Sequence, residues 1–317
     1  MLKKGERWGK KVEYIRNWTK VNETYVQRGI YLLDLEWVEN WDKELEEMNK
    51  GKRGAPFKFP NSLINLQAIW TQYHSYRVAE GMTICLVEFA NLPCSNDYST
   101  IFRRVIKLET KLPAPKSKEI SVSTDGTGMK IGMTGEYLED KYGDGRRKFI
   151  KVVVSGDPYN KDALKVEVSL EGEGDSEPDI AQKHMQELIN EGQEINEFFG
   201  DGLLDTHKLF DFCDMKKIDP KIKIRKNAVV NEDGSWKRNM EIKKYKKLGY
   251  KKWAKEKRYG RRWTGTEGIF SAVKMIYSER VRAKSIENKC AEVHRRFWAY
   301  QTIKRYAEEK IAKKYSL

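Results

Sequence analysis

The sequence predicts an α/β protein: a mixed sheet flanked by helices, with an all-helical domain on its N-terminal side. Two observations lead to this prediction. Apolar residues recur with helical spacing up to a Pro-containing linker at residues 113–118, and after the linker they alternate with the period of two expected of strands. Helical stretches separate the later strands, which favours parallel pairing with helices over both faces of the sheet.

Composition limits the class of protein. The 317 residues are enough for two domains. The hydrophobic fraction of 39% and the aromatic fraction of 11% supply a core and argue against disorder. No apolar run approaches the roughly 20 residues of a membrane span, and the charged start does not resemble a secretory signal. Four cysteines without metal-ligand spacing are typical of a reduced, cytoplasmic protein.

Residues 1–112 are expected to form the helical domain. Asn61 and Ser62 can cap a helix over residues 63–70, a second helix is predicted over 77–89, and a third begins after Asp97. The third helix presents one apolar face and one basic face. Its basic face includes Arg103 and Arg104. Three short helices of this kind fit a DNA-binding helix-turn-helix-like unit, and they fit a plain helical bundle equally well.

Residues 119–317 are expected to form the sheet domain. Turns are predicted at Gly156-Asp157-Pro158 and at residues 143–145. The predicted elements in order are strands at 119–124, 149–155 and 164–170, a helix at 180–191, a strand at 195–199, a helix at 206–216, a strand at 221–225, and a final helix with Glu267 near its start. This is the element order of the RNase H-like fold.

Three carboxylates occupy the ends of these elements. Asp125 follows the first predicted strand, Asp201 follows the fourth, and Glu267 begins the last helix. Carboxylates gathered in one place repel one another, so a site with three of them usually holds cations. Oxygen-only ligands suit Mg²⁺ or Mn²⁺, and two such ions about 4 Å apart can support in-line displacement at phosphorus.

Each carboxylate also has an ordinary structural explanation. Asp125 and Asp201 both precede glycine, as in many turns, and Glu267 suits the positive end of a helix dipole. Asp205, four residues after Asp201, is expected to face solvent. Glu279 is a rival for the third acidic position. It ranks lower because its surroundings lack the upstream tyrosine and arginine that precede Glu267.

The positive charge lies in the last third of the chain. The net charge is +14, yet residues 221–317 contain 29 Lys and Arg against 10 Asp and Glu. A basic block is the electrostatic signature of a polyanion site. Between residues 243 and 262 the cations alternate with aromatic side chains, which can stack on bases, although Trp253 is expected to pack in the core.

The segment around Glu267 resembles the Tyr-x2-Arg-x3-Glu-x6-Lys motif of insertion-sequence transposases of the DDE type. Tyr259 and Arg262 match the first half, and Glu267 and Lys274 match the second. Four residues separate Arg262 from Glu267 where the motif has three, so Arg261 and Arg262 are both candidates for the arginine. The resemblance covers roughly residues 55–300.

This resemblance implies an enzyme, a DDE transposase or polynucleotidyl transferase. Asp125 would bridge two Mg²⁺ ions, with Mn²⁺ as a substitute, and Asp201 and Glu267 would each bind one. Lys274, Arg262, Arg261 and Tyr259 would contact DNA, as would Arg103 and Arg104 of the helical domain. The implied reaction is cleavage at transposon ends and transfer of the 3′-hydroxyl into target DNA. The implied partners are terminal inverted repeats, target DNA and a second copy of the chain, in a cytoplasmic, nucleoid-associated protein.

Two other functions stay open at this stage. One is a transposase relic that binds DNA without cutting it. The other is an actin-like phosphotransferase, because Asp125-Gly126-Thr127-Gly128 also resembles a phosphate-binding turn. The latter requires a second glycine-rich nucleotide loop, which the sequence does not contain.

Overall fold

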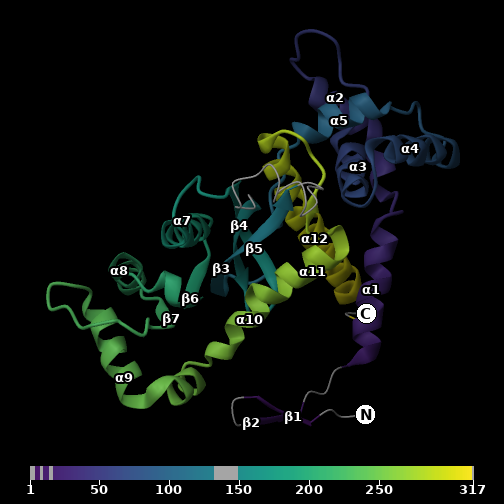
Figure 1. The fold of residues 1–317 in the computed structure, drawn as a ribbon. Coiled ribbons are helices and arrows are strands. Elements are labelled where there is room, and N and C mark those ends of the chain that lie inside the picture. Colours follow the sequence, from purple (N-terminus) through teal and green to yellow (C-terminus); the bar gives the residue numbers. More distant parts are fainter. Residues whose placement is uncertain (1–3, 8–9, 14–16, 132–148, 316–317) are drawn as a thin grey trace, which may run out of the picture. The chain divides into compact units, whose positions relative to one another are not determined.

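The structure is a computed structural model, and it describes residues 4–7, 10–13, 17–131 and 149–315 (Figure 1). The turn predicted at residues 143–145 lies outside these ranges. The chain divides into two compact units. The sheet unit comprises residues 1–16 and 112–293, and the helical unit comprises residues 17–111 and 294–317.

The sheet unit contains a six-stranded mixed sheet. Its strands are β3 (Glu119–Ile131), β4 (Phe149–Asp157), β5 (Asp162–Leu170), β6 (Glu194–Gly200), β7 (Asp219–Ile222) and β8 (Arg280–Val281). The order is β5-β4-β3-β6-β7, with β8 paired to the far end of β3. β4 is antiparallel to both of its neighbours, β3 and β5, and β6 and β7 run parallel to β3. This arrangement confirms the predicted RNase H-like mixed sheet.

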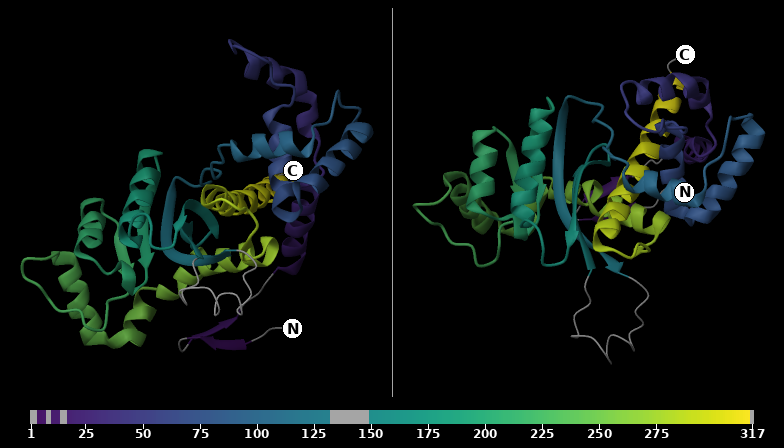
Figure 2. Two further views of the ribbon diagram at one scale, coloured as in Figure 1. Left: turned by 45° about the horizontal axis from the view of Figure 1, so that its top comes forward. Right: turned by 90° about the horizontal axis from the view of Figure 1, so that it is seen from above.

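Helices α7 (Glu177–Asn190) and α8 (His207–Met215) lie beside each other along the sheet (Figures 1 and 2). Apolar side chains of both helices join those of the strands in one buried core. Val122 of β3 and Phe198 of β6 are fully buried there, together with Phe210 of α8. Burial on this scale is the main driving force for the packing. β3 continues through Asp125 to Ile131, so the predicted strand end at residue 124 is wrong.

The end of β7 differs from the prediction of a strand at 221–225. The ladder with β6 runs from Glu197 and Asp219 to Gly200 and Ile222, and the backbone N–H of Lys223 still donates to Gly200. The backbone N–H of Arg225 instead donates to the Asp205 carboxylate, 3.0 Å away. The chain therefore leaves the sheet earlier than its alternating pattern suggests.

Four further helices complete the sheet unit or begin in it. They are α9 (Trp236–Glu256), α10 (Arg262–Gly265), α11 (Glu267–Tyr277) and α12 (Ile286–Tyr315). Helix α9 is broken at Gly249, whose φ of 69° is readily available only to glycine. Two short strands, β1 (Lys4–Arg7) and β2 (Lys10–Glu13), form an antiparallel hairpin that the sequence did not predict.

The helical unit contains the N-terminal helices, and the three helices predicted within residues 61–106 are confirmed. The unit comprises α1 (Trp18–Tyr31), η1 (Glu36–Asn40), α2 (Trp41–Asn49), α3 (Asn61–Tyr73), α4 (Tyr76–Ala90) and α5 (Tyr98–Ile106). Trp41, Leu63 and Trp70 lie in its core. The buried amide of Gln67 bonds with Asn96.

The structure groups residues 294–317 with the helical unit, although the sequence-based boundary placed all of 119–317 in the sheet domain. Side chains on α12 account for the difference. The Tyr306 ring packs edge-on against Tyr31 of α1, with centroids 5.0 Å apart, and the Tyr306 hydroxyl donates to Asp34. Lys314 pairs with Glu23 at 3.0 Å. In the described part of the chain, no helix is both long and apolar enough to cross a membrane.

Candidate active site

The sheet topology brings the strand that contains Asp125 next to the strand that ends before Asp201. β3 pairs with β6 as far as Ser123 and Phe199, and β6 ends at Gly200. Asp125 continues along β3, where it pairs only with Val154 of β4, while Asp201 leaves the sheet to cap the short helix η2 (Gly202–Leu204). Adjacent parallel strands thus deliver both acids to one edge, as their order predicts.

Asp125 is a half-buried carboxylate with a cationic partner. Its Oδ2 accepts from Arg262 Nη1 at 2.7 Å, and its Oδ1 accepts from the backbone N–H of Gly126 at 3.0 Å. Burial raises the pKa of Asp125 to about 6, against the lowering effect of Arg262. Asp201 and Glu267 raise that pKa further. The three predicted acids therefore lie close enough to influence one another's charge.

Glu267 is the first residue of α11, and the preceding helix, α10, makes close contacts with the sheet. The Ser123 hydroxyl donates to the Arg262 carbonyl at 3.3 Å, and the Thr264 hydroxyl donates to the Pro158 carbonyl at 2.5 Å. Gly265 lies so close to the strands that a Cβ there would come within 2.9 Å of Ser123 Cβ. The glycine lets α10 approach the sheet directly, and this contact sets where Glu267 begins its helix.

Lys274 lies two turns after Glu267 on α11 and faces β3. Its Nζ donates to the Thr127 hydroxyl at 2.9 Å, two residues beyond Asp125. Arg262 is 9% exposed, stacks on Trp263 and Tyr259, and leaves its Nε without a described partner. Two cations from the predicted motif thus border the acids, one of them paired directly with Asp125.

Tyr259 and Arg261 occupy different environments. Tyr259 is 4% exposed, and its hydroxyl donates to the Gly200 carbonyl at 3.0 Å, directly before Asp201. Its ring does not face solvent, and its hydroxyl supports the backbone before Asp201. A DNA contact by Tyr259 stays a prediction. Arg261 is exposed and lies 5.3 Å from the ring centroid of the partly exposed Tyr159. Trp253 is fully buried, as predicted.

The two arginines of α5 also differ. Arg104 donates to the Phe59 carbonyl at 3.2 Å and to Asn61 Oδ1 at 2.9 Å, and so ties α5 to the start of α3. Arg103 is exposed, and its described bond is a long one of 3.4 Å to the Ser99 hydroxyl on the same helix. Of this pair, Arg103 has the side chain that is available to a ligand.

The structure places one further carboxylate at the site, which the sequence did not suggest. Glu177 begins α7, and a Cβ on Gly126 would lie 2.6 Å from its Oε1. Burial raises the pKa of Glu177, Lys151 lowers it, and Asp201 raises it. Glu177 follows the N-cap Ser176, so in the sequence it looks like an ordinary helix start. The only sequence signal was Gly126, which leaves the space that the carboxylate occupies.

Two other acids are used elsewhere. Asp205 is 4% exposed, where the sequence predicted a solvent-facing residue, and it forms an ion pair with Arg238 of α9 at 2.6 Å. An ionised side chain this deeply buried requires such a partner. Glu279 pairs with Lys130 and is substantially exposed, so it does not compete with Glu267 for the site.

The donor set at this edge suits a hard divalent cation. Asp125, Asp201 and Glu267 offer only oxygen ligands. Burial is the main cause of the raised pKa of Asp125, and the charges of Asp201 and Glu267 add to it. Among the residues that the structure describes, no three His, Cys, Asp or Glu side chains come together closely enough to hold a metal ion. Arg262 supplies the positive charge next to Asp125 in this arrangement.

Comparisons with known proteins give two family matches. Residues 116–302 match a family described as "Transposase DDE domain", and residues 26–135 match a second family of the same description. No curated protein matches the chain.

Similar solved structures include three assemblies. The Mos1 strand transfer complex is 9% identical, with 86% of this chain and 100% of that chain covered and a TM-score of 0.24. The pre-cleavage Mos1 transpososome is 9% identical, with 93% and 98% covered and a TM-score of 0.21. A simian T-cell lymphotropic virus intasome with the PP2A regulatory subunit B56 gamma is 12% identical, with 56% and 66% covered and a TM-score of 0.23.

Proposed function

This chain belongs to the family of transposases with a DDE domain, and from that premise we propose that it cleaves DNA at the ends of a transposable element and joins the freed 3′-hydroxyl to target DNA. Asp125, Asp201 and Glu267 are the proposed catalytic acids. The observation that supports this assignment best is the parallel pairing of β3, which contains Asp125, with β6, which ends directly before Asp201. Asp201 and Glu267 also raise the pKa of Asp125.

The cationic residues suit a DNA substrate. We assign Lys274 to a phosphate beside Asp125, because its Nζ donates to Thr127, which lies on the same strand as Asp125. Arg262 would exchange Asp125 for a phosphate, since a guanidinium binds either group with two parallel hydrogen bonds. Arg261 and the adjacent Tyr159 offer an exposed cation and ring for the DNA beyond the cleaved bond.

Divalent cations fit this proposal, and members of the family generally use them. Asp125, Asp201 and Glu267 would hold two Mg²⁺ ions, or Mn²⁺ as a substitute. Bound there, the ions would supply the positive charge that a displacement at phosphorus requires. The protein's own residues would orient the phosphodiester: Lys274 and Arg262 hold its oxygens, and Glu267 is fixed by the close packing of α10 on the sheet.

The proposed partners are double-stranded DNA and a second copy of the chain. Terminal inverted repeats and target DNA are the expected substrates, in a nucleoid-associated protein. We assign end recognition or dimerisation to the N-terminal helical residues, where the exposed Arg103 is available to DNA.

Single substitutions test the assignment. Asp125→Ala, Asp201→Ala and Glu267→Ala should each lower Mg²⁺-dependent cleavage of a duplex taken from the DNA that flanks the gene by at least about 100-fold. Asp211→Ala is the matched control, because Asp211 is an exposed carboxylate on α8. Cleavage is measured under single-turnover conditions, and DNA binding is measured in parallel.

Near-wild-type cleavage by any of the three variants would contradict the proposal. Tight DNA binding by the wild-type chain without cleavage in either Mg²⁺ or Mn²⁺ would favour a transposase relic instead.

A further inference from the structure

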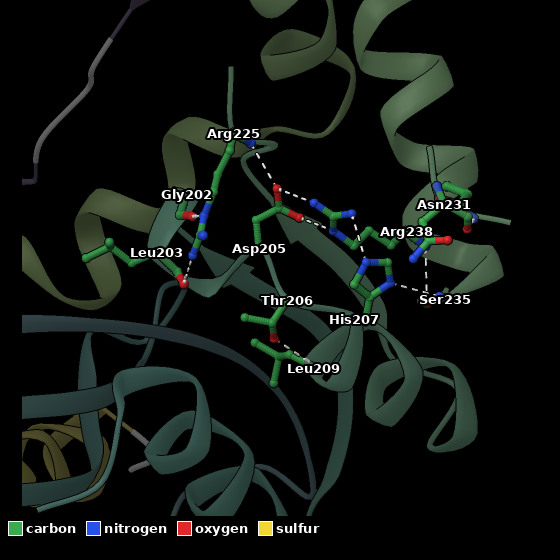
Figure 3. A network of polar contacts seen from close by, with 11 residues as sticks. Gly202, Leu203, Asp205, Thr206, His207, Leu209, Arg225, Asn231, Ser235 and Arg238 are labelled. Carbon is green, nitrogen blue, oxygen red and sulfur yellow. Dashed lines mark hydrogen bonds and ion pairs between the residues drawn. The ribbon is translucent and has the colours of Figure 1, made fainter. Parts of the chain in front are cut away.

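The segment that follows Asp201 is held by an arginine from beyond β7. Arg225 Nε donates to the Gly202 carbonyl at 2.6 Å, and its Nη2 donates to the Leu203 carbonyl at 2.9 Å (Figure 3). The backbone N–H of Leu203 donates in turn to Asp201 Oδ1 at 2.8 Å. The same short turn therefore contacts the Asp201 side chain on one side and Arg225 on the other.

The far end of this segment is held by a buried ion pair. Asp205 accepts from Arg238 Nε at 2.6 Å and from Arg238 Nη2 at 3.1 Å, and the Asp205 side chain is completely buried. Asp205 also accepts from the backbone N–H of Arg225 at 3.0 Å. Figure 3 shows Asp205 between the two arginines, which come from different parts of the chain. Asp205 thus links α9 to the Arg225 backbone.

An interaction of this kind specifies geometry more than it adds stability. A buried ion pair recovers little of its desolvation cost, and well-packed apolar side chains often stabilise a fold equally well. The two-pronged bonds of Arg225 and Arg238 instead restrict direction, because a planar guanidinium forms them in only one orientation. What they restrict here is the turn whose first residue is Asp201.

We propose that Arg225 and Arg238, linked through Asp205, are positioning residues that hold the Asp201 carboxylate in the orientation needed for cation binding. This inference rests on the proposed function, in which Asp201 binds a divalent cation. The orientation of Asp201 then depends on Arg225 and Arg238, which lie 24 and 37 positions further along the chain.

The test uses conservative variants that keep the positive charge. Arg225→Lys and Arg238→Lys lose the two-pronged geometry but not the cation, so electrostatic attraction to DNA is preserved. Mn²⁺ affinity is measured calorimetrically on the full chain without DNA, well below the unfolding temperature of each variant. The expected result is roughly tenfold weaker Mn²⁺ binding, as for other residues that orient a ligand. Cleavage should fall by a similar factor at fixed subsaturating Mg²⁺ and recover at high Mg²⁺.

Lys237→Gln is the matched control. Lys237 pairs with Asp214 at 3.1 Å, so it also joins α9 to α8, but it does not contact the turn after Asp201. Its loss should leave Mn²⁺ affinity unchanged. The Arg225 side chain is exposed, so Arg225→Lys should fold even if Arg238→Lys does not.

The outcomes separate this inference from the proposed function. If Asp201→Ala loses Mn²⁺ binding and cleavage while Arg225→Lys binds Mn²⁺ like the wild type, the positioning role is overturned and the proposed function stands. A lower unfolding temperature with unchanged Mn²⁺ affinity also overturns it. If Asp201→Ala retains both activities, the proposed function fails and the inference fails with it.

Discussion

Asp125 is held between opposing influences. Burial and the neighbouring acids disfavour its charge, while Arg262 favours it, and the balance raises its pKa to about 6. In the unfolded chain the same carboxyl titrates near pH ~3.9. The folded protein therefore binds more protons than the unfolded protein between these two values, so this group's contribution to stability falls as pH rises through that window.

Asp125→Asn should remove this pH dependence. Without divalent cations, the wild type should lose about 1–2 kcal/mol of unfolding free energy relative to the variant between pH 4 and pH 7.5, at a site that solvent still partly screens. Urea unfolding of both proteins at several pH values, with EDTA present, measures the difference. Parallel profiles for the two proteins would show that Asp125 ionises normally.

The acids differ in how far the sequence could reveal them. Asp201 and Glu267 were predicted from their places at the end of β6 and the start of α11. Asp125 was predicted as a strand-end residue, but it lies within β3, because the pairing with β4 continues beyond it. Glu177 and the buried Asp205 were not predicted, because their surroundings depend on how α7 and α9 pack on the sheet unit. Periodicity in the sequence contains no information on such packing.

At the scale of elements, α10 is fixed by the contact of Gly265 with the strands. A Cβ at Gly265 would lie 3.0 Å from Pro158 Cα and 2.9 Å from Ser123 Cβ, where neighbouring backbone cannot easily move. The start of α11, and with it Glu267, depends on this close approach.

Gly265→Ala should therefore destabilise the protein by about 1–3 kcal/mol, the usual cost of overpacking, and should also lower cleavage. Gly268→Ala is the control, because its Cβ would meet only the Trp263 carbonyl at an ordinary 3.6 Å. An alanine inside a helix should leave stability unchanged or raise it by up to about 1 kcal/mol. Urea unfolding tests both variants, and equal effects would contradict this account of Gly265.

The sequence predicted most elements of the sheet but not all of their ends. Strands β4, β5 and β6 begin and end within two residues of their predicted limits, whereas β3 begins as predicted and runs seven residues further, to Ile131. β7 ends early because the backbone N–H of Arg225 donates to the Asp205 carboxylate and not to a neighbouring strand. A bond between residues 20 positions apart has no local sequence pattern.

At the scale of the whole molecule, the charge distribution is the main feature. Residues 221–317 contain the positive excess, and α9 exposes several of its lysines, among them Lys246 and Lys247. Each lysine that neutralises a DNA phosphate releases a counterion, so the logarithm of the binding constant falls linearly with the logarithm of salt concentration.

Lys246→Gln combined with Lys247→Gln should reduce the steepness of this salt dependence by about 1–2. Lys216→Gln with Lys217→Gln removes the same charge from exposed positions after α8 and should have a smaller effect. Fluorescence anisotropy across a salt series measures both slopes. Equal slopes for the two double variants would show that only net charge matters.

Domain limits were harder to predict than the fold. The linker at residues 113–118 lies next to the start of the sheet unit at residue 112, yet the structure groups residues 294–317 with the helical unit. That grouping depends on contacts such as Tyr306 with Tyr31, between residues far apart in the chain. DNA recognition or dimerisation by the N-terminal residues remains a proposal.

The Arg262–Asp125 ion pair has a consequence for how ligands assemble at this edge of the sheet. A phosphate that takes Arg262 leaves Asp125 without its countercharge, and a divalent cation that takes Asp125 leaves Arg262 without its anion. Under the proposed function, each ligand would therefore favour binding of the other, which is positive heterotropic cooperativity. Thermodynamic linkage requires the two enhancements to be equal. Nucleic acid should therefore raise the affinity for cations by the same factor as cations raise the affinity for nucleic acid.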